Sequence, residues 1–201
     1  MTETETTAKE RFGITSFVYK RRRPFHPVRF STLLQGLGKL SISSLNELDS
    51  TETVVGDSDK REAEAGQVSE ELKANLLRSK GFVWMGTSSA AAYFMSHAGQ
   101  FLELVVLGRW WADIPERDWP MESVEEIQID FDPSAPEAGD RRQEIVFIGQ
   151  FGDDSSGTSQ KALEELLDGC LLNDEELEVY NKTAPRGDEA LRQVFFPAPG
   201  E

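Results

Sequence analysis

Residues 47–71 form an acidic stretch that constrains the fold more than any other part of the sequence. They hold nine acidic and two basic residues, no aromatic residue and almost no large apolar side chain. Such a stretch cannot bury enough surface to offset the entropy lost on ordering, so we expect a disordered insertion. The apolar blocks on either side are each too short to fold alone, so they must combine into one domain around it.

Composition limits the number of domains and the classes of partner. A chain of 201 residues has room for one domain with tails, and its twelve Phe and four Trp residues can fill a core. The formal net charge of −15 repels phosphate backbones and anionic lipid. No segment reaches the roughly 18 apolar residues of a membrane span. We therefore expect neither nucleic acid nor a membrane as a partner.

The cysteine count and the N-terminal residues bear on location. Cys170 is the single cysteine, so it cannot form an internal disulfide, which suits a reducing compartment. The first ten residues contain three glutamates and no apolar run, unlike a signal peptide or an Arg-rich transit peptide. A cytoplasmic location is expected, with the nucleus as the alternative.

Hydrophobic patterning predicts the order of strands and helices. Strands are expected in five segments of β-branched and aromatic composition, which are residues 14–19, 81–86, 90–97, 101–107 and 142–151. The runs at 90–97 and 101–107, separated by Ala98-Gly99-Gln100, are spaced like an antiparallel hairpin with a Gly-containing loop. Helices are expected where apolar side chains recur every three to four positions, from Pro27 to a stop at Gly36 and from Ser159 to Cys170. A last short helix is expected at 174–180, where Asn173 can cap it and acidic residues occupy its first turn. Residues 123–131 fit either a helix or a strand, and the chain from Pro185 is predicted to be a loose tail. Because strands and helices do not alternate as βαβ units, this order indicates an α+β fold.

The sequence contains no recognisable catalytic motif. The string nearest to a phosphate-binding loop, Gly36-Leu37-Gly38-Lys39-Leu40, lacks the required spacing and hydroxyl, and a turn after a helix explains it better. No nucleophile elbow, zinc-protease, CxxC or dinucleotide-binding motif is present. We expect no enzyme active site and no bound cofactor in this chain.

Three scattered side chains are the weak candidates for metal ligands: His26, His97 and Cys170. Zinc sites usually draw two ligands from neighbouring positions, which these residues do not offer. The structural interpretation is therefore favoured, with His26 at the start of a helix and the other two in the core. The acidic insertion is interpreted as a solvated loop, because carboxylates on a mobile segment bind cations with little selectivity.

Cationic and aromatic residues supply the candidates for partner contacts. Lys20 to Arg23 fits either a site for an anion or acidic partner, or a solvated sheet edge that blocks strand association. Trp110 and Trp111 are adjacent, so in an extended chain one ring is buried and the other lies nearer the surface as an interface anchor. The residues predicted to contact a partner are Arg21, Arg22, Arg23, Trp110, Trp111, Arg141 and Arg142.

Five blocks of the sequence, taken in order, resemble the C-terminal domain of the CobW-type P-loop GTPases. They are Ser16-Phe17-Val18-Tyr19 with Arg23-Pro24-Phe25-His26-Pro27, Leu77-Arg78-Ser79-Lys80-Gly81-Phe82-Val83-Trp84 with Ala98-Gly99, Gly108-Arg109-Trp110-Trp111-Ala112, residues 139–149, and Leu167-Asp168-Gly169-Cys170-Leu171-Leu172. The resemblance spans residues 12–180, between a leader at 1–11 and a flexible tail at 181–201. It implies an antiparallel sheet of about four to five strands packed against two to three helices.

The resemblance also implies a function and its limits. The family's GTPase half, with its Walker motif and CxCC metal-binding motif, has no counterpart in this sequence. The domain is therefore expected to be a non-catalytic accessory in zinc or cobalt homeostasis, with a GTPase domain in cis or trans, or a metalloprotein client, as partner. Two alternatives remain. The chain is a metal carrier that binds zinc or cobalt through His26, His97, Cys170 or carboxylates, or it is the C-terminal fragment of a longer CobW-type GTPase metallochaperone.

Overall fold

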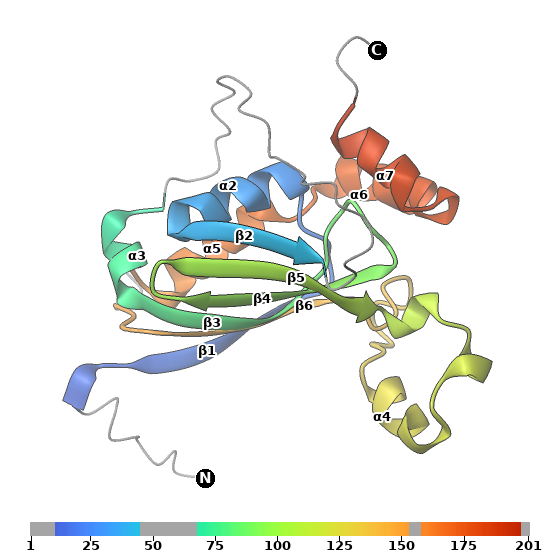
Figure 1. Cartoon of the computed structure of the whole chain (residues 1–201), viewed down its shortest axis with the longest axis horizontal. Coiled ribbons are helices and arrows are strands. Elements are labelled where there is room, and N and C mark those ends of the chain that lie inside the picture. Colours follow the sequence, from blue (N-terminus) through green and yellow to red (C-terminus); the bar gives the residue numbers. More distant parts are fainter. Residues whose placement is uncertain (1–10, 45–67, 153–157, 198–201) are drawn as a thin grey trace.

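Six strands form a single sheet in the order β1-β6-β3-β4-β5-β2 (Figure 1). The computed structural model describes residues 11–44, 68–152 and 158–197. The strands are β1 (Thr15–Arg21), β2 (Lys39–Ser44), β3 (Leu76–Val83), β4 (Ala91–Ala98), β5 (Phe101–Arg109) and β6 (Gln143–Gly149). All neighbours are antiparallel except β2, which runs parallel to β5. The predicted α+β class and antiparallel pairing are confirmed.

The sheet has one strand more than the sequence predicted. The additional strand, β2, has the sequence KLSISS, whose few apolar positions alternate with serines and give a weak strand signal. Its register is nevertheless continuous, from Lys39 opposite Phe101 to Ser44 opposite Val106. The hairpin of β4 and β5 matches its prediction, and Gly99 supplies the positive φ of +60° that its turn requires.

Six α-helices and four short 3₁₀ turns accompany the sheet in the described residues. The helices are α2 (Pro27–Leu37), α3 (Glu70–Asn75), α4 (Val124–Ile129), α5 (Gln160–Cys170), α6 (Asp174–Thr183) and α7 (Asp188–Phe195). The turns are η1 (Trp111–Asp113), η2 (Glu116–Asp118), η3 (Met121–Ser123) and η4 (Ala184–Arg186). No helix in these ranges combines the length and the apolar character needed to cross a membrane.

Side-chain caps fix the starts of the predicted helices. The Ser159 hydroxyl accepts a hydrogen bond from the Ala162 amide at the start of α5, and Asn173 forms a capping box with Glu176 at the start of α6. Helix α2 continues past the predicted stop at Gly36 and ends at Leu37, with Gly38 as its C-cap. Glycine inside a helix costs only about 1 kcal/mol, and the buried leucines on either side of Gly36 outweigh that cost.

The structure decides one prediction that was left open and changes two others. Residues 124–129, for which helix and strand were both open, form α4. The chain after Pro185 forms α7 instead of a loose tail, because Leu191 is buried and Phe195 packs against the same core cluster. Of the predicted acidic insertion, the last residues belong to α3, which Ser69 caps, whereas residues 45–67 lie outside the described ranges.

One face of the sheet carries the main core. Helices α2 and α5 pack side by side on it, and Phe25 stacks on Phe30 with ring centroids 4.1 Å apart. Alternate side chains of the strands, such as Phe17, Tyr19 and Phe147, point into this layer and are buried. The residues between them in sequence lie on the opposite face, where burial is incomplete.

Candidate interaction surface

Each cation of the run at the end of β1 is held by groups of the same chain. Lys20 lies 2.6 Å from Glu144 on the neighbouring strand. Arg21 makes a two-pronged contact with Asp168, which also accepts the hydroxyl proton of Tyr19 at 2.8 Å. Arg23 donates to the Leu172 carbonyl and to Asp174. The run therefore makes contacts within the chain. This differs from both earlier interpretations, a solvated sheet edge and a free site for an anion.

Arg22, Arg141 and Arg142 fasten the segment that connects β5 to β6. This segment, residues 110–142, is called the arm here, and it contains η1, η2, η3 and α4. Arg22 donates to the carbonyl oxygens of Asp130, Gly139 and Arg141 at 2.7–3.3 Å. Arg141 donates to the Ser89 and Ala138 carbonyls, and Arg142 to the carbonyl of Asp140 and to Glu144. Arginines predicted to contact a partner thus hold the base of the arm.

The two adjacent tryptophans have different environments. Trp110 is only 3% exposed and packs near Phe82, so its ring is unavailable at the surface in this conformation. Trp111 is partly exposed, and its edge meets Trp119 with ring centroids 6.2 Å apart. The opposite orientations that the sequence predicted are therefore present, and Trp111 is the ring nearer the surface.

Asp140 is a site residue that sequence reasoning missed. It is 2% exposed, and its two carboxylate oxygens accept hydrogen bonds from the Trp111 and Ala112 amides, both at 2.9 Å. These amides begin η1 and have no partner within that turn. The signal in the sequence is Gly139, whose φ of +63° makes the turn that brings Asp140 to η1.

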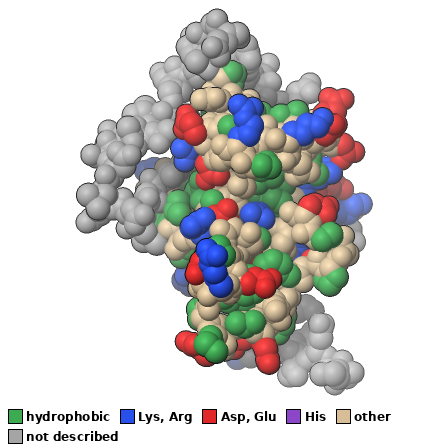
Figure 2. Space-filling model, turned by 90° about the vertical axis from the view of Figure 1, so that its right-hand side faces the viewer, with side chains coloured by type: hydrophobic (Ala, Val, Ile, Leu, Met, Phe, Trp, Pro, Cys, Tyr) green, Lys and Arg blue, Asp and Glu red, His purple; other side chains and the backbone are tan. Residues whose placement is uncertain are grey.

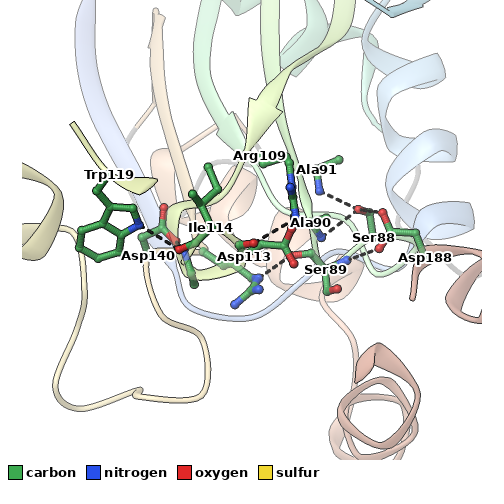
Figure 3. Close-up of polar contacts among 12 residues, drawn as sticks. Ser88, Ser89, Ala90, Ala91, Arg109, Asp113, Ile114, Trp119, Asp140 and Asp188 are labelled. Atoms are coloured by element: carbon green, nitrogen blue, oxygen red, sulfur yellow. Dashed lines mark hydrogen bonds and ion pairs between the residues drawn. The ribbon is translucent and has the colours of Figure 1, made fainter. Parts of the chain in front are cut away.

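A second polar network ties α7 to the loop between β3 and β4 (Figure 3). Ser88 donates its hydroxyl proton to Asp188, and the same carboxylate accepts from the Ser89 amide at 2.9 Å. The Ser88 hydroxyl oxygen in turn accepts from the Ala91 amide at 2.8 Å. Figure 3 also shows Arg109 pairing with Asp113 at the start of the arm. The Ser88–Asp188 contacts and the Arg109–Asp113 pair therefore both join parts of this chain to one another.

His26 caps helix α2 and contacts α6. Its Nδ1 accepts from the Arg29 amide, and its Nε2 lies 3.9 Å from Glu176, which Arg29 binds through two hydrogen bonds. Burial and the nearby Arg29 charge lower the pKa of His26. The imidazole acts as a helix cap, as the structural interpretation of the sequence expected.

His97 and Cys170 are core residues. His97 Nε2 lies 2.8 Å from the Gly99 carbonyl, while its Nδ1 is buried without a hydrogen-bond partner. Burial lowers the pKa of His97 and raises that of the Cys170 thiol to about 12. The Cys170 thiol donates to the Leu166 carbonyl within its own helix.

The structure does not bring the three metal-ligand candidates together. The His26 amide donates to the Cys170 carbonyl at 2.8 Å, so these two lie at the start of α2. His97 lies on β4, three residues before Gln100, whose carbonyl accepts a hydrogen bond from the Lys39 amide just beyond the opposite end of α2. An 11-residue helix is about 16 Å long, which is too far for shared coordination. Within the described ranges, no three His, Cys, Asp or Glu side chains are grouped to hold a metal ion.

The sheet face opposite α2 and α5 leaves apolar side chains of the strands exposed. Val18 and Val146 are cross-strand partners on it, 47% and 38% exposed. Phe82 and Phe94 pair beside them, and the Arg142 guanidinium lies over the Phe82 ring. Near exposed Phe101, a depression of about 290 Å³ is lined by residues of the adjacent strands β2, β5 and β4. This face combines apolar centres with charged neighbours, as protein interfaces do.

The fold and these surfaces define an α+β domain with one helix-covered and one open sheet face. Residues 57–171 match the cobalamin synthesis protein cobW C-terminal domain. Because this match covers more than half of the chain, the protein belongs to the CobW C-terminal domain family. The resemblance predicted from the sequence blocks is confirmed.

A relative and two solved structures resemble the chain over most of its length. The chain is 31% identical over 167 residues to zinc-regulated GTPase metalloprotein activator 1 of Dictyostelium discoideum, covering 83% of this chain and 27% of the relative. A zinc-bound YjiA GTPase from E. coli is 13% identical with a TM-score of 0.43, covering 83% of this chain and 32% of that one. A zinc-bound triple mutant of the same GTPase is 12% identical with a TM-score of 0.42, covering 79% of this chain and 30% of that one. The chain thus spans about a third or less of each.

Proposed function

We propose that this domain is a non-catalytic accessory that associates with a CobW-type GTPase domain, in the same polypeptide or in a separate one. The observation that carries the proposal is family membership over residues 57–171, together with similarity to a GTPase of which the chain covers only 27%. In this arrangement the GTPase domain hydrolyses GTP and carries zinc as its cargo. The accessory domain supplies a rigid surface that positions the GTPase or its metalloprotein client.

The open sheet face supports the proposal as the docking surface for the GTPase domain. Val18 and Val146 are exposed apolar residues on the edge strand β1 and its neighbour β6, and they lie on a six-stranded sheet whose backbone is already ordered. Binding to such a surface costs little conformational entropy.

The test mixes this chain with the GTPase domain of a CobW-type relative from which the C-terminal domain has been removed. We expect a one-to-one complex in size-exclusion chromatography with light scattering at micromolar concentration, and a changed rate of GTP hydrolysis. Val146→Asp should abolish the complex, since it places a charge among the exposed apolar side chains of the face. Val179→Asp on exposed α6 is the matched control and should leave it intact. Absence of a complex with the unchanged chain would contradict the proposal.

A further inference from the structure

The outer end of the arm is a helical surface that nothing in the described part of the chain covers. Turn η3 leads directly into α4, and Ile127 points inward and is buried. Side chains three to four positions apart share one side of such a helical run. The outward side carries five exposed residues, called the tip stripe here: Met121, Glu122, Glu125, Glu126 and Ile129.

Met121 and Ile129 are unusual among the apolar residues of this protein. They are 91% and 80% exposed, the highest values among the large hydrophobic side chains that the structure describes. A single exposed apolar residue needs no explanation. Two of them bracket three glutamates on one side of a short helical run, and that arrangement gives the surface a defined pattern.

The charge of the tip stripe is not neutralised by the part of the chain that the structure describes. Residues 111–137 hold nine acidic residues and only Arg117 as a cation. The aspartates at the base of the arm have partners, since Asp113 binds Arg109 and Asp130 binds Arg142. The glutamates of the tip stripe have no ion pair among the described residues, so their charge is available to a cationic partner.

The arm holds this surface on a packed base. Trp119 is buried between Trp111 and Phe131, and its indole nitrogen donates to the Ile114 carbonyl at 2.9 Å. Figure 1 shows α4 standing away from the sheet and the other helices, and Figure 2, which faces that side, shows acidic and hydrophobic side chains together at the lower end. A preformed surface of this kind loses little freedom when it binds.

We propose that the tip stripe docks a Lys- and Arg-rich amphipathic helix of a partner protein. Cations of that helix pair with the three glutamates, and apolar side chains spaced about two turns apart, roughly 12 Å, cover Met121 and Ile129. Nucleic acid and anionic membranes do not fit, because the surface is strongly acidic. The tip stripe shares no residue with the open sheet face, so this inference stands without the GTPase association.

The test uses a synthetic Leu/Lys helix with leucines two turns apart, and a scrambled peptide of the same composition. Binding to the full chain is measured by fluorescence anisotropy of labelled peptide at low and physiological salt. We expect the patterned peptide to bind, and Met121→Ser/Ile129→Ser and Glu125→Gln/Glu126→Gln each to weaken binding at least about tenfold. Circular dichroism of each variant checks that the fold is retained.

Matched variants separate the tip stripe from the general acidity of the chain. Phe101→Ser removes another exposed apolar side chain, and Glu71→Gln/Glu175→Gln removes two exposed acids elsewhere. Both should change affinity less than about twofold. Equal binding of the scrambled peptide, or equal weakening by these controls, would overturn the proposal. Self-association of the chain that Met121→Ser/Ile129→Ser abolishes would assign the surface to a second copy instead and would also overturn it.

Discussion

Replacing Gln143 should destabilise the domain more than any surface substitution on the same strand. Its side chain is fully buried and joins the end of β1 to the end of β3. The amide nitrogen donates to the Arg23 and Trp84 carbonyls at 2.9 and 2.8 Å, and the amide oxygen accepts from the Trp84 amide at 3.0 Å. Gln143→Leu keeps a similar volume but removes all three hydrogen bonds.

The magnitude follows from what each partner loses. The Trp84 carbonyl retains the Phe25 amide as a donor at 2.9 Å, whereas the buried Trp84 amide loses its partner. With a net contribution of about 1 kcal/mol per hydrogen bond, we expect the free energy of unfolding to fall by about 3 kcal/mol. That is a large share of the 5–15 kcal/mol typical of a domain.

Urea denaturation followed by tryptophan fluorescence measures this change as a shift of the midpoint at constant slope. Gln150→Leu is the matched control, because its amide also donates to a backbone carbonyl, that of Phe12, but at an exposed position. The control should cost less than about 0.5 kcal/mol. If the two variants are destabilised equally, or Gln143→Leu by less than about 1 kcal/mol, the hydrogen-bond argument is wrong.

Three further substitutions or treatments test other features of the fold. Gly81→Ala would place a Cβ 1.9 Å from a carbonyl oxygen of β6, so thermal unfolding should show a loss of at least about 3 kcal/mol, while Gly108→Ala, which meets no atom within 4 Å, serves as the mild control. The Arg29 guanidinium lowers the pKa of Glu176, so this carboxylate stabilises the fold above its ordinary value of 4.5 and loses that effect as the pH falls through its lowered pKa. The stability difference between the unchanged chain and Glu176→Gln should therefore be present at pH 7 and shrink in acid, and a constant difference would contradict the sign. Burial raises the pKa of Cys170 to about 12, so the thiol should resist Ellman's reagent at pH 8 until denaturant is added, and rapid native labelling would refute its burial.

Local signals in the sequence predicted helix starts and turns correctly, because the groups that interact there are close along the chain. Ser159 and Asn173 predicted the starts of α5 and α6, because a cap bonds an amide only a few residues away. Gly99 predicted the β4–β5 turn for the same reason. The match to the CobW C-terminal domain then gave the family, although no single residue of that match specifies a site.

Features that depend on distant partners were missed or misjudged. The run containing Arg21 and Arg23 was interpreted either as a site for an anion or acidic partner or as a solvated edge, because their acids, Asp168 and Asp174, lie far along the chain and meet them only through the fold. The arm gave no clear pattern, because its core of Trp119 and neighbouring rings is built from 3₁₀ turns without a regular period. Strand β2 and helix α7 likewise owe their order to packing more than to propensity.

The pairing of β1 with β6 also determines how much of the chain must be synthesised before the sheet and its core can be completed. Thr15 lies opposite Gly149, and α2 packs on α5, so the first elements made have partners among the last. The β4–β5 hairpin, by contrast, joins two strands that are consecutive in the sequence, so it can form before any later residue is synthesised. A nascent chain that has not reached β6 leaves Phe17 and Tyr19 without cover. Slow translation before residue 143 therefore lengthens the interval in which these aromatics are open to aggregation and to chaperones.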